Sequence, residues 1–160
     1  MKKNVLVPYD GSTNAMDALQ QAIALVIATG EKIVLLNVQP TFHTAHTKIF
    51  FSQKDIVEYQ EQLCRETVAP AVKALKESGV PFDVRLKAGV PRDIILEEAS
   101  RDGEDGVRLI VMGSHGHNPI VGSFLGTTSY GVLQKAPCPV MIVPYKEPAE
   151  EGSFDAEMPT

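Results

Sequence analysis

Three glycines and a run of hydroxyl side chains form the part of this sequence best suited to chemistry. The glycines are spaced as G-x2-G-x9-G, at Gly113, Gly116 and Gly126, and are followed directly by Thr127, Thr128 and Ser129. A glycine has no Cβ, so backbone N–H groups can approach an anion closely there. The hydroxyls lie where a helix should begin, and a helix N-terminus favours negative charge. The pattern predicts a phosphate cradle, although glycines that serve only turn geometry would give the same spacing.

A carboxylate occupies a comparable position near the start of the chain. Asp10 follows an apolar stretch at residues 4–8 and precedes a Gly11-Ser12 turn. A carboxylate accepts hydrogen bonds and so suits the hydroxyls of a ribose. Asp before a helix also commonly caps that helix or its turn, and the two roles can coexist. Val38, at the end of the next apolar stretch, could frame a base through its backbone.

Apolar runs alternate with helical patterns along the chain, which is typical of an α/β fold with a mainly parallel sheet. Strands are expected at residues 4–8, 33–38, 82–87, 108–112 and 140–143, and helices at about 12–29, 54–78 and 128–135 and after Pro91. We expect a single-domain, open, five-stranded parallel sheet of order 3-2-1-4-5, Rossmann-like, with helices on both faces. Ligands of such sheets bind beyond the carboxyl ends of the strands, where the strand order reverses. That point lies between the first and fourth strands, next to Asp10 and the glycine segment.

Local signals set several element boundaries. Gly30 and Gly79 should end the first two long helices, and Ser12 should cap the first of them. Pro70 lacks a backbone donor and should kink or split the helix that contains it. Residues 39–52 have no clear period and are expected to form a loop or irregular insertion.

The acidity of the chain belongs to its last residues. The whole sequence has 20 acids and 15 bases, but residues 145–160 hold five of the acids and one base. Residues 1–144 are therefore nearly neutral, and neither part has the basic surface expected of a nucleic-acid binder. We expect residues 1–144 to form the domain and residues 145–160 to be an acidic, disordered, solvated tail. No apolar run is long enough to span a membrane.

Several segments together resemble the universal stress protein family over residues 3–144. The most specific is G-x2-G-x9-G-[ST], the nucleotide-binding signature of that family, which Thr127 completes here. A lone glycine triplet would be weak evidence, but this one follows the expected fourth strand and the other segments occur in order. These segments are VLVPYDGS at 5–12, GVP at 89–91, VMGSHG at 111–116 and APCPV at 136–140.

Resemblance to the ATP-binding branch of this family implies a set of contacts and an assembly. Asp10 would contact the ribose, and ATP would be bound with or without Mg²⁺. The resemblance also implies a homodimer joined through the last strand, at Val140–Val143. The residues implied to hold the nucleotide are Pro8, Asp10, Val38, Met112, Gly113, Gly116, Gly126, Thr127, Thr128 and Ser129.

Histidines and cysteines invite other hypotheses, which we weigh against simpler ones. His43, His46, His115 and His117 form two close pairs, but nothing in the sequence brings the pairs together as metal ligands. Solvated loop histidines are the simpler interpretation, with one of them as an alternative donor to a phosphate. Cys64 and Cys138 show no paired-motif spacing; both are expected to be structural, and the expected compartment is the cytoplasm.

Three functional hypotheses follow. The leading one is an ATP-binding, dimeric regulatory module acting in stress adaptation. The second is an enzyme, either a slow ATPase or a nucleotidyl-transfer relative; residues 113–129 contain no Lys or Arg, which argues against efficient phosphoryl transfer. The third is a protein-interaction adaptor in which nucleotide is incidental.

Overall fold

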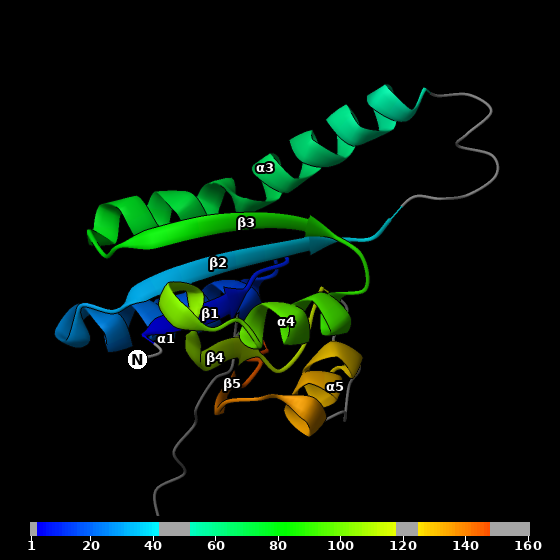
Figure 1. Ribbon diagram of the computed structural model, residues 1–160. Coiled ribbons are helices and arrows are strands. Elements are labelled where there is room, and N and C mark those ends of the chain that lie inside the picture. The colour runs from blue at the N-terminus through cyan, green and yellow to red at the C-terminus, as the bar shows by residue number, and fades with distance from the viewer. Residues whose placement is uncertain (1–2, 42–51, 118–124, 148–160) are drawn as a thin grey trace, which may run out of the picture.

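The central strands of the sheet consist almost entirely of apolar residues, as a sheet covered on both faces requires. The computed structural model describes residues 3–41, 52–117 and 125–147, so residues 42–51 of the expected insertion and 148–160 of the expected tail lie outside the described part. The five strands are β1 (Asn4–Pro8), β2 (Lys32–Gln39), β3 (Phe82–Ala88), β4 (Val107–Gly113) and β5 (Val140–Val143). All pairings are parallel and the order is β3-β2-β1-β4-β5, which confirms the predicted fold (Figure 1).

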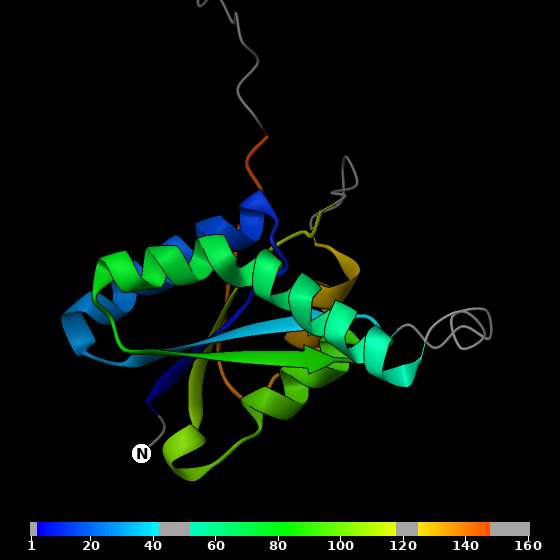
Figure 2. The ribbon, with the colours of Figure 1, turned by 90° about the horizontal axis from the view of Figure 1, so that it is seen from above.

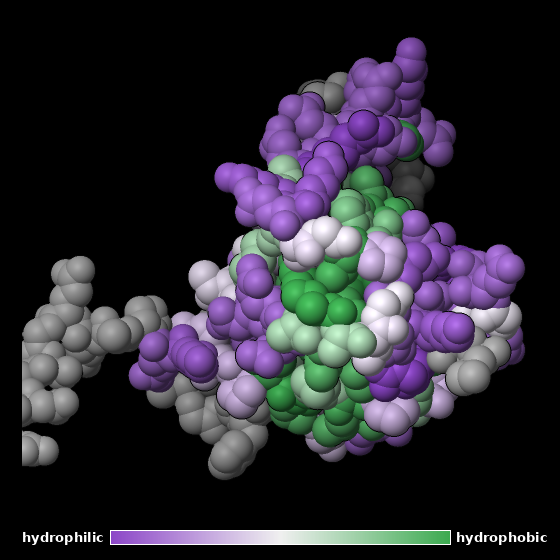
Figure 3. All heavy atoms as spheres, turned by 90° about the vertical axis from the view of Figure 1, so that its left-hand side faces the viewer, coloured by the Kyte–Doolittle hydropathy of each residue, from purple (hydrophilic) through white to green (hydrophobic). Residues whose placement is uncertain are grey.

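Helices cover both faces of this sheet (Figures 1 and 2). They are α1 (Thr13–Thr29), α3 (Gln53–Ser78), α4 (Pro91–Ala99) and α5 (Thr127–Lys135), with a short 3₁₀ helix, η1 (Gly103–Asp105), before β4. Alternate residues of each strand face opposite sides. Val5 and Val7 pack with α1 and α3, whereas Leu6 packs with α4 and α5. Seen from the amino ends of the strands, the sheet is an apolar band between hydrophilic flanks (Figure 3).

The predicted caps are present at both long helices. Ser12 accepts a hydrogen bond from the Ala15 N–H at 3.1 Å. Gly30 and Gly79 end α1 and α3 in the left-handed conformation, with φ of 70° and 72°, which a glycine adopts without the steric cost of a Cβ.

Pro70 was expected to kink or split its helix. It does not split it, because α3 runs continuously from Gln53 to Ser78, but the ribbon of α3 changes direction midway along its length, as a kink would produce (Figures 1 and 2). A proline inside a helix removes one intrahelical hydrogen bond, here to the carbonyl of Glu66. Pro70 and Glu66 are both exposed, so water can satisfy that carbonyl. Val68 and Ala71, on either side of the proline, are buried against the core and hold the helix together.

A buried carboxylate ties α4 to the edge of the sheet. The Glu98 side chain is 2% exposed and accepts hydrogen bonds from Arg85 on β3 and from Arg101 after α4. Arg85 also donates to Asp105 at 2.8 Å, which joins η1 to the same cluster. The cluster fixes the positions of α4 and η1 relative to β3. None of the helices in the described part of the chain is long and apolar enough to cross a membrane.

We expect Glu98→Ala to lower the free energy of unfolding by about 2–4 kcal/mol, since it leaves the half-buried guanidinium of Arg85 without its main partner. Urea titration monitored by circular dichroism measures the change. Glu97→Ala is the matched control, because its carboxylate is exposed on the same helix. Equal stability of the two variants would show that the cluster is not a structural anchor.

Candidate functional site

A cavity of about 360 Å³ opens at the carboxyl ends of β1 and β4, the predicted reversal point of the sheet. Strand β2 and helix α4 supply apolar side chains to it, including Leu36 and Ile95. The segments after β1 and β4 and the first turn of α5 supply polar groups. All ten residues predicted from the sequence line this one cavity: Pro8, Asp10, Val38, Met112, Gly113, Gly116, Gly126, Thr127, Thr128 and Ser129.

Asp10 has one oxygen committed to the local turn and one directed at Gly116, which belongs to the segment after β4 that also carries Gly113 and His115 (the glycine loop). Its Oδ1 accepts a hydrogen bond from the Ser12 N–H at 2.9 Å. A Cβ on Gly116 would lie 3.1 Å from Oδ2, so the absence of a side chain at Gly116 leaves Oδ2 its space. Asp10 therefore stabilises its turn and also lines the cavity, while the cap of α1 is Ser12.

The backbone of Val38 faces the cavity because β1 ends before β2 does. The ladder between them stops at Pro8 and Leu36, with one further bond from the Tyr9 N–H to the Leu36 carbonyl. In a parallel ladder the next donor to the Tyr9 carbonyl would be the Val38 N–H. The side-chain amide of the buried Asn37 donates to the Tyr9 carbonyl instead, at 2.8 Å. The backbone of Val38 is therefore not used by the ladder with β1 and faces the cavity.

Tyr9, next to Asp10, also lines the cavity and is 4% exposed. Burial raises the pKa of the Tyr9 phenol, and the charge of Asp10 raises it further. The phenol therefore keeps its proton at neutral pH and packs in the core as a neutral group.

The glycine loop is closed onto α5 by two hydrogen bonds. The Gly126 N–H donates to the Ser114 carbonyl at 2.6 Å, and the Ser129 hydroxyl donates to the Gly113 carbonyl at 2.8 Å. Gly126 and the Ser129 hydroxyl thus hold the loop in place and are not open donors. The N–H groups of the first helical turn, at residues 127–129, have no intrahelical partner by helix geometry and point toward the cavity end of α5.

Asn14 connects the loop to the rest of the sheet, and the sequence reasoning missed it. Its Oδ1 accepts from the His115 N–H at 2.9 Å, and its Nδ2 donates to the Val143 carbonyl at 3.0 Å. A Cβ on Gly113 would lie 2.7 Å from the Asn14 Cγ, so the loop can approach the amide only with glycine there. The signal in the sequence was a polar residue on the apolar face of α1, in line with Ala18 and Ala22.

The two histidines of the loop have defined partners, so the interpretation of them as solvated is only partly right. His117 is exposed, but its Nε2 lies 2.6 Å from the Asp10 carbonyl and must donate to it. His115 lines the cavity, with its Nδ1 2.8 Å from the Ser114 hydroxyl and its ring edge-on to Tyr145. No group of three His, Cys or carboxylate side chains in the described segments could hold a metal ion. His43 and His46 lie outside those segments.

Cys64 is buried against the core, as expected for a structural thiol. Burial raises the pKa of the thiol, and the nearby charge of Glu61 raises it further, so the reactive thiolate is disfavoured.

Asn14→Ala should lower the free energy of unfolding by about 1–3 kcal/mol, because it removes the side-chain acceptor of the His115 N–H and one of the two donors to the Val143 carbonyl, which also accepts from the Ser114 N–H. The matched control is Gln21→Ala, on the exposed face of the same helix. Chemical denaturation of both variants measures the difference. An Asn14→Ala protein as stable as the control would contradict the bridging role.

Comparisons with known proteins agree on one family. The model of the universal stress protein family matches residues 1–144. A universal stress protein of Thermus aquaticus is 33% identical over 146 residues, covering 89% of this chain and 99% of that protein. Among solved structures, hypothetical protein MJ0577 has a TM-score of 0.78 at 26% identity, covering 92% of this chain and 99% of the other.

A third similarity shows the fold alone. A universal stress protein family protein from Arabidopsis thaliana, solved with AMP bound, has a TM-score of 0.60 at 24% identity, covering 92% of this chain and 97% of that one. The match to the family model spans nearly all the described residues, and the strand order is the one predicted for it. The chain belongs to the universal stress protein family.

Proposed function

We propose that this protein binds an adenine nucleotide, preferentially ATP, and acts as a dimeric, nucleotide-dependent regulatory module in the stress response. The observation that carries the proposal is the cavity at the sheet's reversal point, where Asp10 and the first turn of α5 share one space. The AMP bound to the Arabidopsis protein of the same fold supports an adenine nucleotide as the ligand class.

The apolar side of the cavity suits the base of a nucleotide, and the side formed by the first turn of α5 suits its phosphates. The base would lie against Leu36 and Ile95, with hydrogen bonds to the backbone of Val38. Asp10 Oδ2 would accept from a ribose hydroxyl. The phosphates would meet the N–H groups and hydroxyls of Thr127 and Thr128, where the helix N-terminus favours anions. Mg²⁺ would accompany ATP on its phosphates, as it commonly does.

The donor set favours binding over turnover. Phosphoryl transfer normally uses a Lys or Arg on the phosphates and a residue that orients the nucleophile. Residues 113–129 contain no Lys or Arg, and none lines the described cavity. A bound nucleotide would instead favour the conformation that holds it, and so shift the population of states that a partner recognises.

The proposed dimer would pair β5 with β5 of a second copy in the cytoplasm. β5 is an edge strand of four residues, and Met141 on it is 37% exposed. Exposed Tyr130 and Leu133 on α5 add apolar surface to the region after the glycine loop. An edge strand with unpaired backbone groups is a natural pairing surface.

The first test is to denature the purified protein, identify any released nucleotide, and titrate ATP, ADP, AMP and cyclic AMP against stripped protein. Asp10→Asn should weaken ATP binding about tenfold, because the amide keeps the turn oxygen but loses the charge-assisted bond to the ribose. It should not weaken binding of the deoxyribose analogue that lacks the contacted hydroxyl. Calorimetry measures both affinities.

Asp17→Asn is the matched control, since Asp17 is exposed on α1 away from the cavity. An Asp10→Asn protein that binds ATP and every deoxyribose analogue as the unaltered chain does would refute the ribose contact. Failure of all four nucleotides to bind the stripped protein would refute the proposed function itself.

Turnover should be well below the usual enzyme range of about 1–10³ per second. A steady-state assay of phosphate release with ATP and Mg²⁺ measures it. Several turnovers per second, lost in the Asp10→Asn variant, would favour the alternative that the protein is an ATPase.

A further inference from the structure

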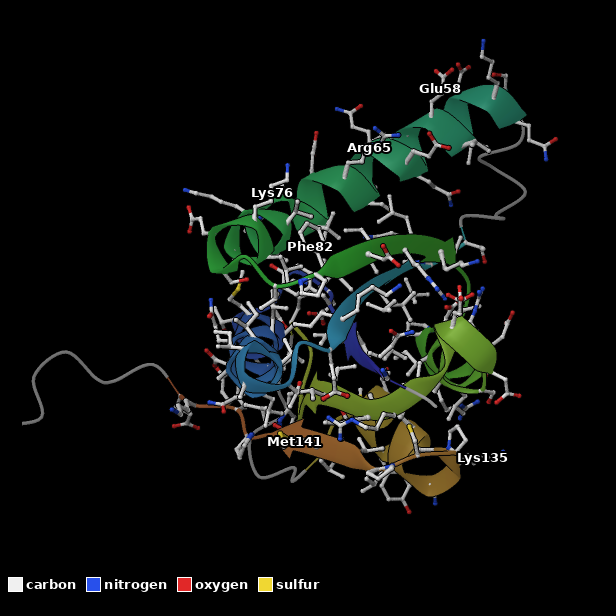
Figure 4. All side chains as sticks on the ribbon, turned by 60° about the vertical axis from the view of Figure 1, so that its left-hand side comes forward. Glu58, Arg65, Lys76, Phe82, Lys135 and Met141 are labelled. Carbon is white, nitrogen blue, oxygen red and sulfur yellow. The ribbon has the colours of Figure 1, made fainter. Side chains whose placement is uncertain are left out.

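A groove of about 700 Å³ lies between α3 and β3, at the edge of the sheet farthest from β5. Helix α3 diverges from β3 toward its own N-terminus, which opens a wedge between them (Figures 1 and 4). None of the residues that line the groove also lines the cavity at the carboxyl ends of β1 and β4, so the groove is a separate surface. Its apolar lining comes from both elements, with Val68, Ala69 and Val72 on α3 and Val84 and Leu86 on β3.

The backbone of β3 has a row of hydrogen-bonding groups that β2 does not use. The Gly89 N–H donates to the Gln39 carbonyl, so the odd-numbered residues of this strand bond to β2. Alternation along a parallel ladder directs the N–H and carbonyl groups of the even-numbered residues to the free edge. No strand of the described part of the chain lies on that side. The backbone groups of Val84, Leu86 and Ala88 are therefore placed to pair with one more strand.

Uncompensated positive charge lies beside this groove. Arg65 and Lys76 line it near the two ends of its α3 side, and both are exposed (Figure 4). Neither forms an ion pair with any residue that the structure describes. The other two charges of the lining, Lys73 and Glu77, lie 4.0 Å apart and compensate each other. Complementary charge therefore favours an acidic occupant.

The spacing of these groups defines the occupant further. A strand added beside Val84 and Leu86 would place alternate side chains in the groove. Arg65 and Lys76 are eleven positions apart on α3, which is about 16 Å along the helix axis. Two strand residues six positions apart lie on one face, about 20 Å from each other, within reach of two long basic side chains. The fitting segment has two apolar residues at alternate positions, flanked by acids on the same face.

A second copy of the chain matches this edge poorly. Pairing two β3 edges would bring Arg65 and Lys76 of both copies into one interface, and like charges in an interface are costly. Lys87, on the opposite face of β3, is 43% exposed and adds to this repulsion, although Glu98 lies 3.8 Å from it. An acidic strand meets attraction at the same positions.

We propose that β3 and the groove beside α3 bind an extended, acidic segment of another protein by strand addition. The segment pairs its backbone with Val84 and Leu86, inserts two apolar side chains beneath α3 and brings its flanking carboxylates to the two unpaired bases. In this mode of recognition main-chain hydrogen bonds give affinity, and the pockets for alternate side chains give specificity. The surface is separate from the cavity, so the proposal does not depend on nucleotide binding.

A synthetic peptide of sequence Glu-Thr-Val-Thr-Val-Thr-Glu, blocked at both ends, tests the proposal on the full-length chain. Calorimetry measures its affinity for the unaltered chain and for the double variant Arg65→Glu with Lys76→Glu. The double variant should bind it at least about tenfold more weakly, because its carboxylates then face two acids in place of two bases. The matched control, Lys3→Glu with Lys54→Glu, changes the net charge equally at exposed bases outside the groove and should bind like the unaltered chain.

Hydrogen exchange distinguishes strand addition from simple charge attraction. With the peptide bound, the amides of Val84 and Leu86 should exchange at least about tenfold more slowly, because the added strand protects them. The amides of Arg85 and Lys87 already bond to β2 and should not change.

Three results would overturn the proposal. A peptide that does not bind, or that binds as tightly when lysines replace both of its glutamates, would refute recognition of an acidic segment. Unchanged exchange of the Val84 and Leu86 amides in the bound protein would refute strand addition. Protection of these amides without peptide, rising with protein concentration, would assign the edge to a second copy of the chain.

Discussion

The site depends on one buried carboxamide, that of Asn14, which joins the ends of three strands. Asn14 lies in the first turn of α1, directly after β1, and bonds the loop after β4 and the last residue of β5. Loss of the carboxamide acceptor of the His115 N–H in this part-buried place would cost about 1–3 kcal/mol. The carboxamide therefore sets the separation between the turn that carries Asp10 and the glycine loop. The geometry of the cavity therefore follows from a packing constraint.

The same constraint assigns different roles to the three glycines. Gly113 is needed because a Cβ would collide with Asn14, and Gly116 because a Cβ would press on Asp10. Gly126 donates its N–H to Ser114 and so closes the loop onto α5. The sequence pattern suggested that the glycines let their own backbone N–H groups approach an anion. In the structure, the N–H groups better placed for an anion are those of the first turn of α5, which the glycines help to position.

The sequence was sufficient for the fold because each signal was local. Alternating strand and helix patterns predicted the sheet order, and Ser12, Gly30 and Gly79 ended their helices where expected. The ten candidate residues converge on one cavity because the carboxyl ends of parallel strands share one edge. That convergence does not test what they bind.

Partnerships between residues far apart in the chain were beyond prediction. Asn14 and His115 are 101 positions apart, and only the folded sheet brings them together. The commitment of the Ser129 hydroxyl to Gly113 was hidden in the same way, since the pattern shows a hydroxyl and not its partner. At Pro70 the local rule allowed either a kink or a split, and burial of the helix on either side of the proline keeps α3 continuous.

The two edge strands of the sheet, β5 and β3, differ in length, in exposed apolar surface and in charge. β5 is four residues long with an exposed Met141, which suits pairing with a copy of itself. β3 is longer, and α3 passes close beside it on one face while Arg85 and Lys87 put charge on the other. Two β3 edges brought together would set these charges against each other.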